Sequence, residues 1–128
     1  MKAKFLLGVG ALLGVAAIPI PTNAEEDKPT IQALYQKCKS NDPQKVYCFG
    51  FIDGIVTHMR IMAIAAEQMD NQVERRFLLE LSKFCGHDAS RGAMLQAFLN
   101  WAEKHPEKWS QYDGFGVVEA LQETWPCR

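Results

Sequence analysis

The chain has 128 residues and four cysteines, and 23% of its residues are charged. This length favours a single domain with one hydrophobic core. The formal net charge is −1, and lysine and arginine do not cluster among aromatic residues. This pattern argues against binding to nucleic acid or to an anionic membrane surface.

Residues 1–24 have the pattern of an export signal. Two lysines precede an apolar run from Phe5 to Ile20, and the short segment after it ends in the small residue Ala24. The run has 16 residues, fewer than the roughly 20 that a membrane-spanning helix needs. The sequence therefore predicts cleavage after Ala24, with no stable membrane insertion afterwards, and a single domain at residues 25–128 in the periplasm. A retained anchor is the alternative.

Two helices are expected in the first half of the exported chain. Thr30 can cap a short helix, and the segment from Ser40 to Pro43 ends it. A second helix then runs from about Pro43 to Met69. The buried stripe of the first helix has the spacing i, i+3, i+4, i+7 and consists of Ile31, Leu34, Tyr35 and Cys38.

The second helix is apolar over most of its circumference, which is typical of a helix surrounded by other helices or by a second subunit. Gly50 and Gly54 lie one turn apart on it, and each costs a helix about 1 kcal/mol relative to alanine. This spacing favours close packing of a neighbour at the two glycines, with Phe51 and Ile55 as the adjoining packing residues; simple tolerance of glycine is the alternative.

Three further helices are expected in the second half of the chain. A stripe from Val73 to Phe84 predicts the third helix, Asp88 or Ser90 starts the fourth, and the fourth ends near His105. After a loop at residues 107–116, Val117, Val118, Leu121 and Trp125 mark the last helix. No segment alternates with period two, so the sequence predicts an all-α, disulfide-stabilised bundle of four to five helices.

Four cysteines in about 100 exported residues predict two disulfides. Spacing alone leaves three possible connectivities open. If the helices run up and down, Cys48 begins the long helix on the side where Cys85 and Cys127 end theirs. This arrangement favours pairing Cys48 with Cys85 and Cys38 with Cys127.

The residues that catalysis would require do not form a set. Asp53 and His58 point roughly 140° apart on a helix, and His87–Asp88 adjoins a cysteine that a disulfide accounts for. His105 is better explained as a residue at a helix C-terminus. The cysteines lack the close pairs of a zinc site. We therefore expect no enzymatic activity, no metal and no cofactor.

Two segments are candidates for binding a partner. The loop at 107–116 offers Trp109 and Tyr112 as large anchors beside the charged Asp113, a composition typical of interaction hot spots. The alternative is that both rings pack back onto the core. The second candidate is the turn that precedes Arg75 and Arg76, for which a simply solvated charged surface is the alternative.

A series of short motifs resembles the type VI secretion amidase effector immunity proteins, the Rap/Tai-type periplasmic family. The motifs are Cys38, Tyr47–Gly54, Phe84–Cys85, His105–Glu107 and Trp125–Cys127, in the order of that family. The resemblance covers nearly all of the chain from residue 31 to residue 127. It implies an exported helical protein, a homodimer, that occludes a peptidoglycan amidase without catalysing a reaction.

Two departures limit this resemblance. The segment from Met59 to Lys83 is longer than the family pattern leads one to expect, and an extra turn or hairpin there would remodel the surface. The shared motifs are also scaffold residues, so they identify no contacts with a toxin. The alternative function is that of a periplasmic stress protein, similar to the small acid-activated chaperones, which have fewer cysteines.

Overall fold

A computed structural model describes residues 28–40 and 43–127. Within these residues the fold is all-α, as expected, with five α-helices and one short 3₁₀ helix. Their bounds are α1 Ile31–Lys39, α2 Gln44–Glu67, α3 Gln72–Ser82, α4 Arg91–Lys104, η1 Pro106–Lys108 and α5 Asp113–Thr124. The export signal expected at residues 1–24 lies outside the described residues.

Three helix starts have side-chain caps, among them the starts expected at Thr30 and Ser90. Thr30 accepts a hydrogen bond from the backbone of Ala33 at 3.2 Å, and Ser90 accepts one from Ala93 at 3.2 Å. Asn71 caps α3 through the backbone N–H of Val73 at 2.9 Å. Short polar side chains satisfy N–H groups that have no partner within a helix, so these boundaries follow from local sequence.

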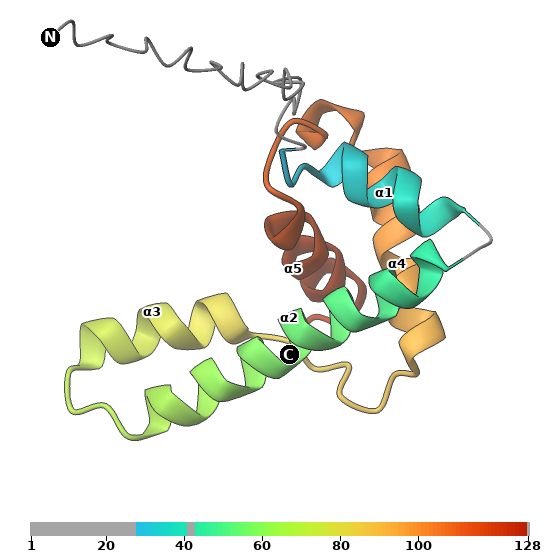
Figure 1. Cartoon of the computed structure of the whole chain (residues 1–128). Coiled ribbons are helices and arrows are strands. Elements are labelled where there is room, and N and C mark those ends of the chain that lie inside the picture. The colour runs from blue at the N-terminus through green and yellow to red at the C-terminus, as the bar shows by residue number, and fades with distance from the viewer. Residues whose placement is uncertain (1–27, 41–42, 128) are drawn as a thin grey trace, which may run out of the picture.

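The core lies between α1, α4, α5 and the first half of α2 (Figure 1). The stripe predicted for α1 is confirmed, because Ile31, Leu34, Tyr35 and Cys38 are all buried. Phe98 of α4 and Leu121 of α5 are completely buried and complete the centre of the bundle. Only one side of α2 packs against this core.

The second half of α2 and all of α3 form a two-helix arm that extends from the bundle (Figure 1). The stripe that predicted α3 is largely exposed: Val73 is 78% exposed, Phe77 62% and Leu81 40%, whereas Phe84, beyond the helix, is buried. The sequence pattern correctly predicts a helix. The stripe is exposed because, among the described residues, α3 packs mainly on α2.

The disulfides join Cys38 to Cys48 and Cys85 to Cys127. The expected pairing of Cys48 with Cys85 and Cys38 with Cys127 is therefore wrong. The short connection between α1 and α2 brings the end of one helix to the start of the next, and their cysteine Cα atoms lie 5.5 Å apart. The departure of α3 into the arm leaves Cys85 near the end of α5 rather than at the start of α2.

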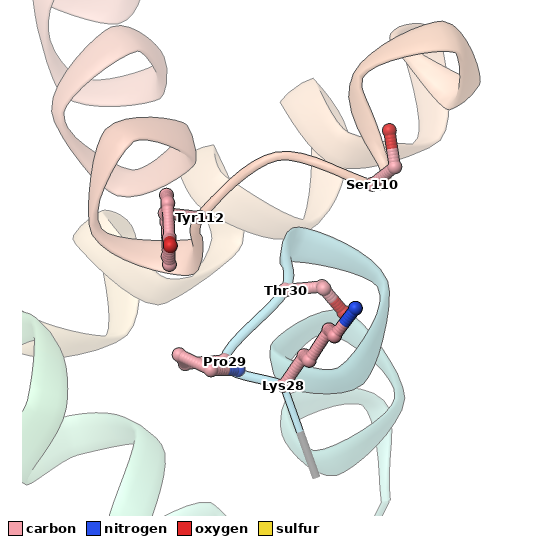
Figure 2. Close-up of a pocket in the computed structure, with 5 residues that line it drawn as sticks. All are labelled: Lys28, Pro29, Thr30, Ser110 and Tyr112. Atoms are coloured by element: carbon pink, nitrogen blue, oxygen red, sulfur yellow. The ribbon is translucent and has the colours of Figure 1, made fainter. Parts of the chain in front are cut away.

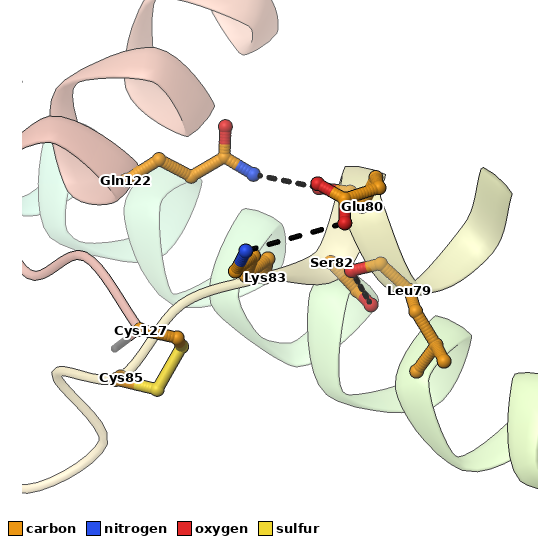
Figure 3. Close-up of a disulfide and its surroundings, with 7 residues drawn as sticks. All are labelled: Leu79, Glu80, Ser82, Lys83, Cys85, Gln122 and Cys127. Carbon is orange, nitrogen blue, oxygen red and sulfur yellow. Dashed lines mark hydrogen bonds and ion pairs between the residues drawn. A yellow bond between two sulfur atoms is a disulfide. The ribbon is translucent and has the colours of Figure 1, made fainter. Parts of the chain in front are cut away.

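A second set of contacts joins the root of the arm to α5 (Figure 3). The Gln122 side chain donates hydrogen bonds to the carbonyl oxygens of Glu80 and Leu81 at 3.1 and 3.3 Å. The backbone N–H of Cys85 donates to the Trp125 carbonyl at 3.2 Å. Together with the Cys85–Cys127 disulfide, these bonds anchor the C-terminal end of α3 and leave its N-terminal end away from the bundle.

The close packing expected at Gly50 and Gly54 is not present among the described residues. A Cβ added at either glycine would meet nothing within 4 Å, whereas one at Gly116 would lie 2.6 Å from Ile31 Cγ1 and one at Gly86 2.7 Å from the Trp125 ring. Phe51 and Ile55 do pack against the core as partly buried residues. The glycines that bring elements together are thus Gly86 and Gly116.

Among the described helices, α2 is long and apolar enough to cross a membrane by length and composition alone. The same properties occur in core helices of soluble proteins. Here α2 contributes Cys48, Ile52, Val56 and Met59 to the core. Burial of these residues accounts for part of its apolar character.

Candidate interaction surface

The loop before α5 is held by backbone hydrogen bonds to the segment that precedes α1. Thr30 and Tyr112 form an isolated antiparallel bridge. Next to it, the Ile31 N–H donates to the Gln111 carbonyl at 2.9 Å and the Asp113 N–H donates to the Pro29 carbonyl at 3.0 Å. These bonds fix the backbone on both sides of Tyr112.

Trp109 packs against the protein and is only partly exposed. Its indole N–H donates to the Ala102 carbonyl at 2.8 Å, and its ring stacks on Tyr35 with 5.5 Å between ring centroids. Both the polar and the apolar parts of the side chain therefore have partners within the chain. Of the two alternatives weighed for this ring, packing onto the core is the one that the structure supports.

Tyr112 has the opposite placement. Its side chain is 66% exposed, and its ring meets the ring of Phe115, 61% exposed, edge to face at 6.5 Å. Tyr112 also borders a hollow of about 460 Å³ whose other lining residues come from the segment before α1 and from the loop (Figure 2). These lining residues are Lys28, Pro29, Thr30 and Ser110.

Asp113 lies at the first position of α5, directly after Tyr112. One of its carboxylate oxygens accepts a hydrogen bond from the Gly114 N–H at 2.7 Å. Partial burial is the main influence on this carboxyl group and raises its pKa above the ordinary value, against the opposing effects of that hydrogen bond and of the Lys37 charge. Asp113 therefore contributes a hydrogen bond at the start of the helix.

Arg75 and Arg76 lie on the exposed side of the arm. Neither guanidinium group has a carboxylate within ion-pair distance in the part of the chain that the structure describes. Arg76 borders an open, mainly apolar groove of about 410 Å³ together with Val73 and Phe77. The structure thus combines free positive charge with apolar area on α3, far from the loop that carries Tyr112.

The sequence patterns did not identify two of the exposed aromatic residues as surface residues. Phe115 lies within the predicted loop, but only Trp109, Tyr112 and Asp113 were proposed there as binding residues; the structure places Phe115 in the first turn of α5 with its ring 61% exposed. Phe77 belongs to the stripe that predicted the third helix, and such a stripe indicates which residues share a face and not what covers that face. No local signal in the sequence would have identified Phe77 as exposed.

Two of the polar residues weighed for catalysis, Asp53 and His87, line one open hollow. Asp53 forms an ion pair with Arg91 at 2.8 Å. His105 is the C-cap of α4, as its expected position implied, and its ring approaches Glu107 at 3.0 Å and Glu123 at 3.7 Å. No group of three or more histidine, cysteine or acidic residues suited to a metal ion occurs among the described residues.

The comparisons with known proteins identify a family. No curated protein and no solved structure matches the chain. The family model for Rap1a immunity proteins matches residues 30–127, a span that contains all five helices and both disulfides. The chain therefore belongs to the Rap1a immunity protein family.

Proposed function

We propose that this protein is an exported, non-catalytic inhibitor that binds a peptidoglycan amidase effector and occludes its active site. The observation that carries this proposal is the family match over residues 30–127, which supplies the role of immunity protein. The resemblance described above supplies the amidase. The two disulfides are compatible with an exported protein, because oxidising compartments such as the periplasm maintain such bonds.

We place the main contact with the effector around Tyr112. Its ring is exposed while its backbone is held by the bridge to Thr30, so little conformational freedom is lost when a partner binds. Large aromatic side chains in such positions are typical hot spots. The adjacent hollow in Figure 2 accepts a side chain of the effector and gives shape specificity.

The arm is the second surface of this proposal. Its exposed Val73 and Phe77 provide apolar area, and Arg75 and Arg76 provide charge at the edge of that area. The arm coincides with the segment from Met59 to Lys83 that is longer than the family pattern. A surface that differs in length from the family pattern is suited to discriminate between related effectors.

The homodimer implied by the resemblance is part of this proposal, as is the periplasmic location. Both favour inhibition of a peptidoglycan amidase. Export places the inhibitor in the compartment that contains peptidoglycan, and a dimer presents each of its surfaces twice. Neither a catalytic group nor a cofactor is required for inhibition by occlusion.

Inhibition of amidases encoded beside this gene tests the proposal. The purified protein is added to each amidase, and cleavage of peptidoglycan fragments is followed by chromatography. We expect complete loss of cleavage near one inhibitor chain per amidase. Full activity of every such amidase at a large excess of the protein would contradict the proposal.

The surface is tested by two matched alanine variants. Tyr112→Ala is expected to weaken amidase binding by about 2 kcal/mol or more, or roughly 30-fold, as is typical of a hot spot. Phe77→Ala removes an aromatic ring of similar exposure from the arm and serves as the comparison. A larger loss with Phe77→Ala would move the main contact from the loop to the arm.

A further inference from the structure

An open hollow of about 330 Å³ lies between the middle of α2, the loop after α3 and the start of α4. It shares no lining residue with the hollow beside Tyr112. Its size is at the lower end of the range for small-molecule sites. We call it the α2–α4 hollow, and its lining residues are Asp53, Val56, Thr57, Arg60, His87, Ala89, Arg91 and Met94.

The floor of the α2–α4 hollow is apolar. Val56 and Met94 belong to the core and are each only 5% exposed, and Ala89 packs against the core as a partly buried residue. The polar lining residues are more exposed and therefore form the rim. A ligand that fits the hollow has a small apolar group for the floor and a polar group for the rim.

Positive charge exceeds negative charge on the rim. Arg60 and Arg91 each carry a guanidinium group, which has five N–H donors and no acceptor. Among the described residues of the lining, Asp53 is the single carboxylate, and it is paired with Arg91 at 2.8 Å. Arg60 has no carboxylate within ion-pair distance in the part of the chain that the structure describes. Its guanidinium makes a long hydrogen bond of 3.5 Å to the His87 carbonyl, so it is available to an anion.

From these features we infer that the α2–α4 hollow binds the terminal carboxylate of a small peptide whose last residue has a short apolar side chain. A guanidinium group matches a carboxylate in shape and can donate two parallel hydrogen bonds to it. Arg60 supplies this group, and the Thr57 hydroxyl, three residues before it on the same helix, is a further donor on the same face. The short side chain of the peptide covers Val56 and Met94.

The two parts of the hollow favour a peptide over other anions. Inorganic phosphate would satisfy the rim, but it has no apolar group for the floor. Peptides of the bacterial cell wall end in alanine, which has both a carboxylate and a methyl group. The choice of a cell-wall peptide rests on the export and the amidase partner of the proposed function. The carboxylate site itself rests only on the lining of the hollow.

Titration with N-acetyl-D-alanyl-D-alanine tests the inference. The purified, disulfide-bonded protein is labelled with nitrogen-15, and its backbone amide signals are followed as the peptide is added. We expect saturable shifts concentrated in residues 53–60 and 87–94, which border the hollow. The same peptide with a C-terminal amide should cause no such shifts, because it lacks the carboxylate.

Three variants make the result specific. Arg60→Gln should weaken peptide binding about 10-fold or more, because it removes charge-assisted hydrogen bonds. Arg75→Gln makes the same change of charge on α3, outside the lining, and should leave binding unchanged. Asp53→Asn should tighten binding several-fold, because it releases Arg91 from its pair and removes the competing carboxylate. Circular dichroism verifies that each variant unfolds at the temperature expected for a folded protein.

Several outcomes would overturn the inference. Shifts that do not saturate would do so, as would equal binding of the amidated peptide or of inorganic phosphate. Weaker amidase inhibition by Arg60→Gln, without peptide binding to the wild type, would assign the hollow to an acidic side chain of the effector instead. The titrations contain no amidase, so a protein that binds the peptide but inhibits no amidase contradicts only the proposed function.

Discussion

Substitution of Gly116 by alanine tests whether close packing in this protein depends on the glycines that the structure singles out. The Cβ of an alanine would lie 2.6 and 2.8 Å from Ile31 Cγ1 and Cδ1 and 3.3 Å from Trp101 Cζ3. Ile31 is completely buried, and its N–H is bonded to the Gln111 carbonyl at 2.9 Å. Its side chain can therefore make room only by displacing other core residues.

The expected magnitude is the difference of two effects. Overpacking at such a site costs typically about 1–3 kcal/mol, and the two contacts below 3.0 Å place Gly116→Ala near the upper end. Alanine in place of glycine within a helix returns about 1 kcal/mol. A net loss of about 1–2 kcal/mol remains, which lowers the melting temperature of a domain of this size by roughly 5–10 °C.

The matched control is Gly50→Ala, also within a helix but in open space. It should keep or raise the melting temperature. Both variants are followed by circular dichroism with the disulfides intact and at low protein concentration, where a dimer contributes least to stability. Equal or higher stability of Gly116→Ala would refute the reasoning, because it would show that the contact of α5 with Ile31 is not closely packed.

The remaining predictions concern the disulfides and two carboxyl groups. Loss of the Cys85–Cys127 bond by paired serine substitution should destabilise the protein by about 4 kcal/mol, and loss of the Cys38–Cys48 bond by about 3 kcal/mol. The difference arises because the two bonds close loops with sequence separations of 42 and 10 residues. Denaturant titration of the two variants measures this order, and the reverse order would contradict the prediction. Cys38 and Cys48 are almost completely buried whereas Cys85 is exposed, so mild reduction followed by alkylation and mass spectrometry should label Cys85 and Cys127 first. The hydrogen bond from the Tyr35 hydroxyl, and then the one from Lys39, lower the pKa of Glu103 below its ordinary value of 4.5. The ionised Glu103 carboxylate therefore stabilises the fold above that value, and this stabilisation is lost as the pH falls through the folded-state pKa. Glu103→Gln should flatten this acidic limb when unfolding free energy is measured against pH. Burial raises the pKa of Asp113, so its charged form costs stability above the folded-state pKa; Asp113→Asn should gain stability at pH 7 relative to the wild type but not at about pH 3, where both side chains are neutral.

The candidate surface was predictable only in part. The loop composition correctly drew attention to Tyr112, whose exposure the structure confirms, but Trp109 from the same loop packs on Tyr35. The two rings have similar chemistry and lie three residues apart in the sequence. Their different placement depends on the Ala102 carbonyl, seven residues before Trp109, and on Tyr35 of α1, which no local pattern connects to this loop.

The features that can be predicted from the sequence are those that depend on neighbouring residues. Caps such as Thr30 and Ser90, and the 3.6-residue periodicity, act within one or two turns, so the helix starts and the all-α class follow from them directly. Tertiary structure decided how the cysteines pair, which glycines are closely packed, and that the stripe on α3 is exposed. Periodicity defines an apolar face, but the element that covers this face lies elsewhere in the chain, or on another molecule.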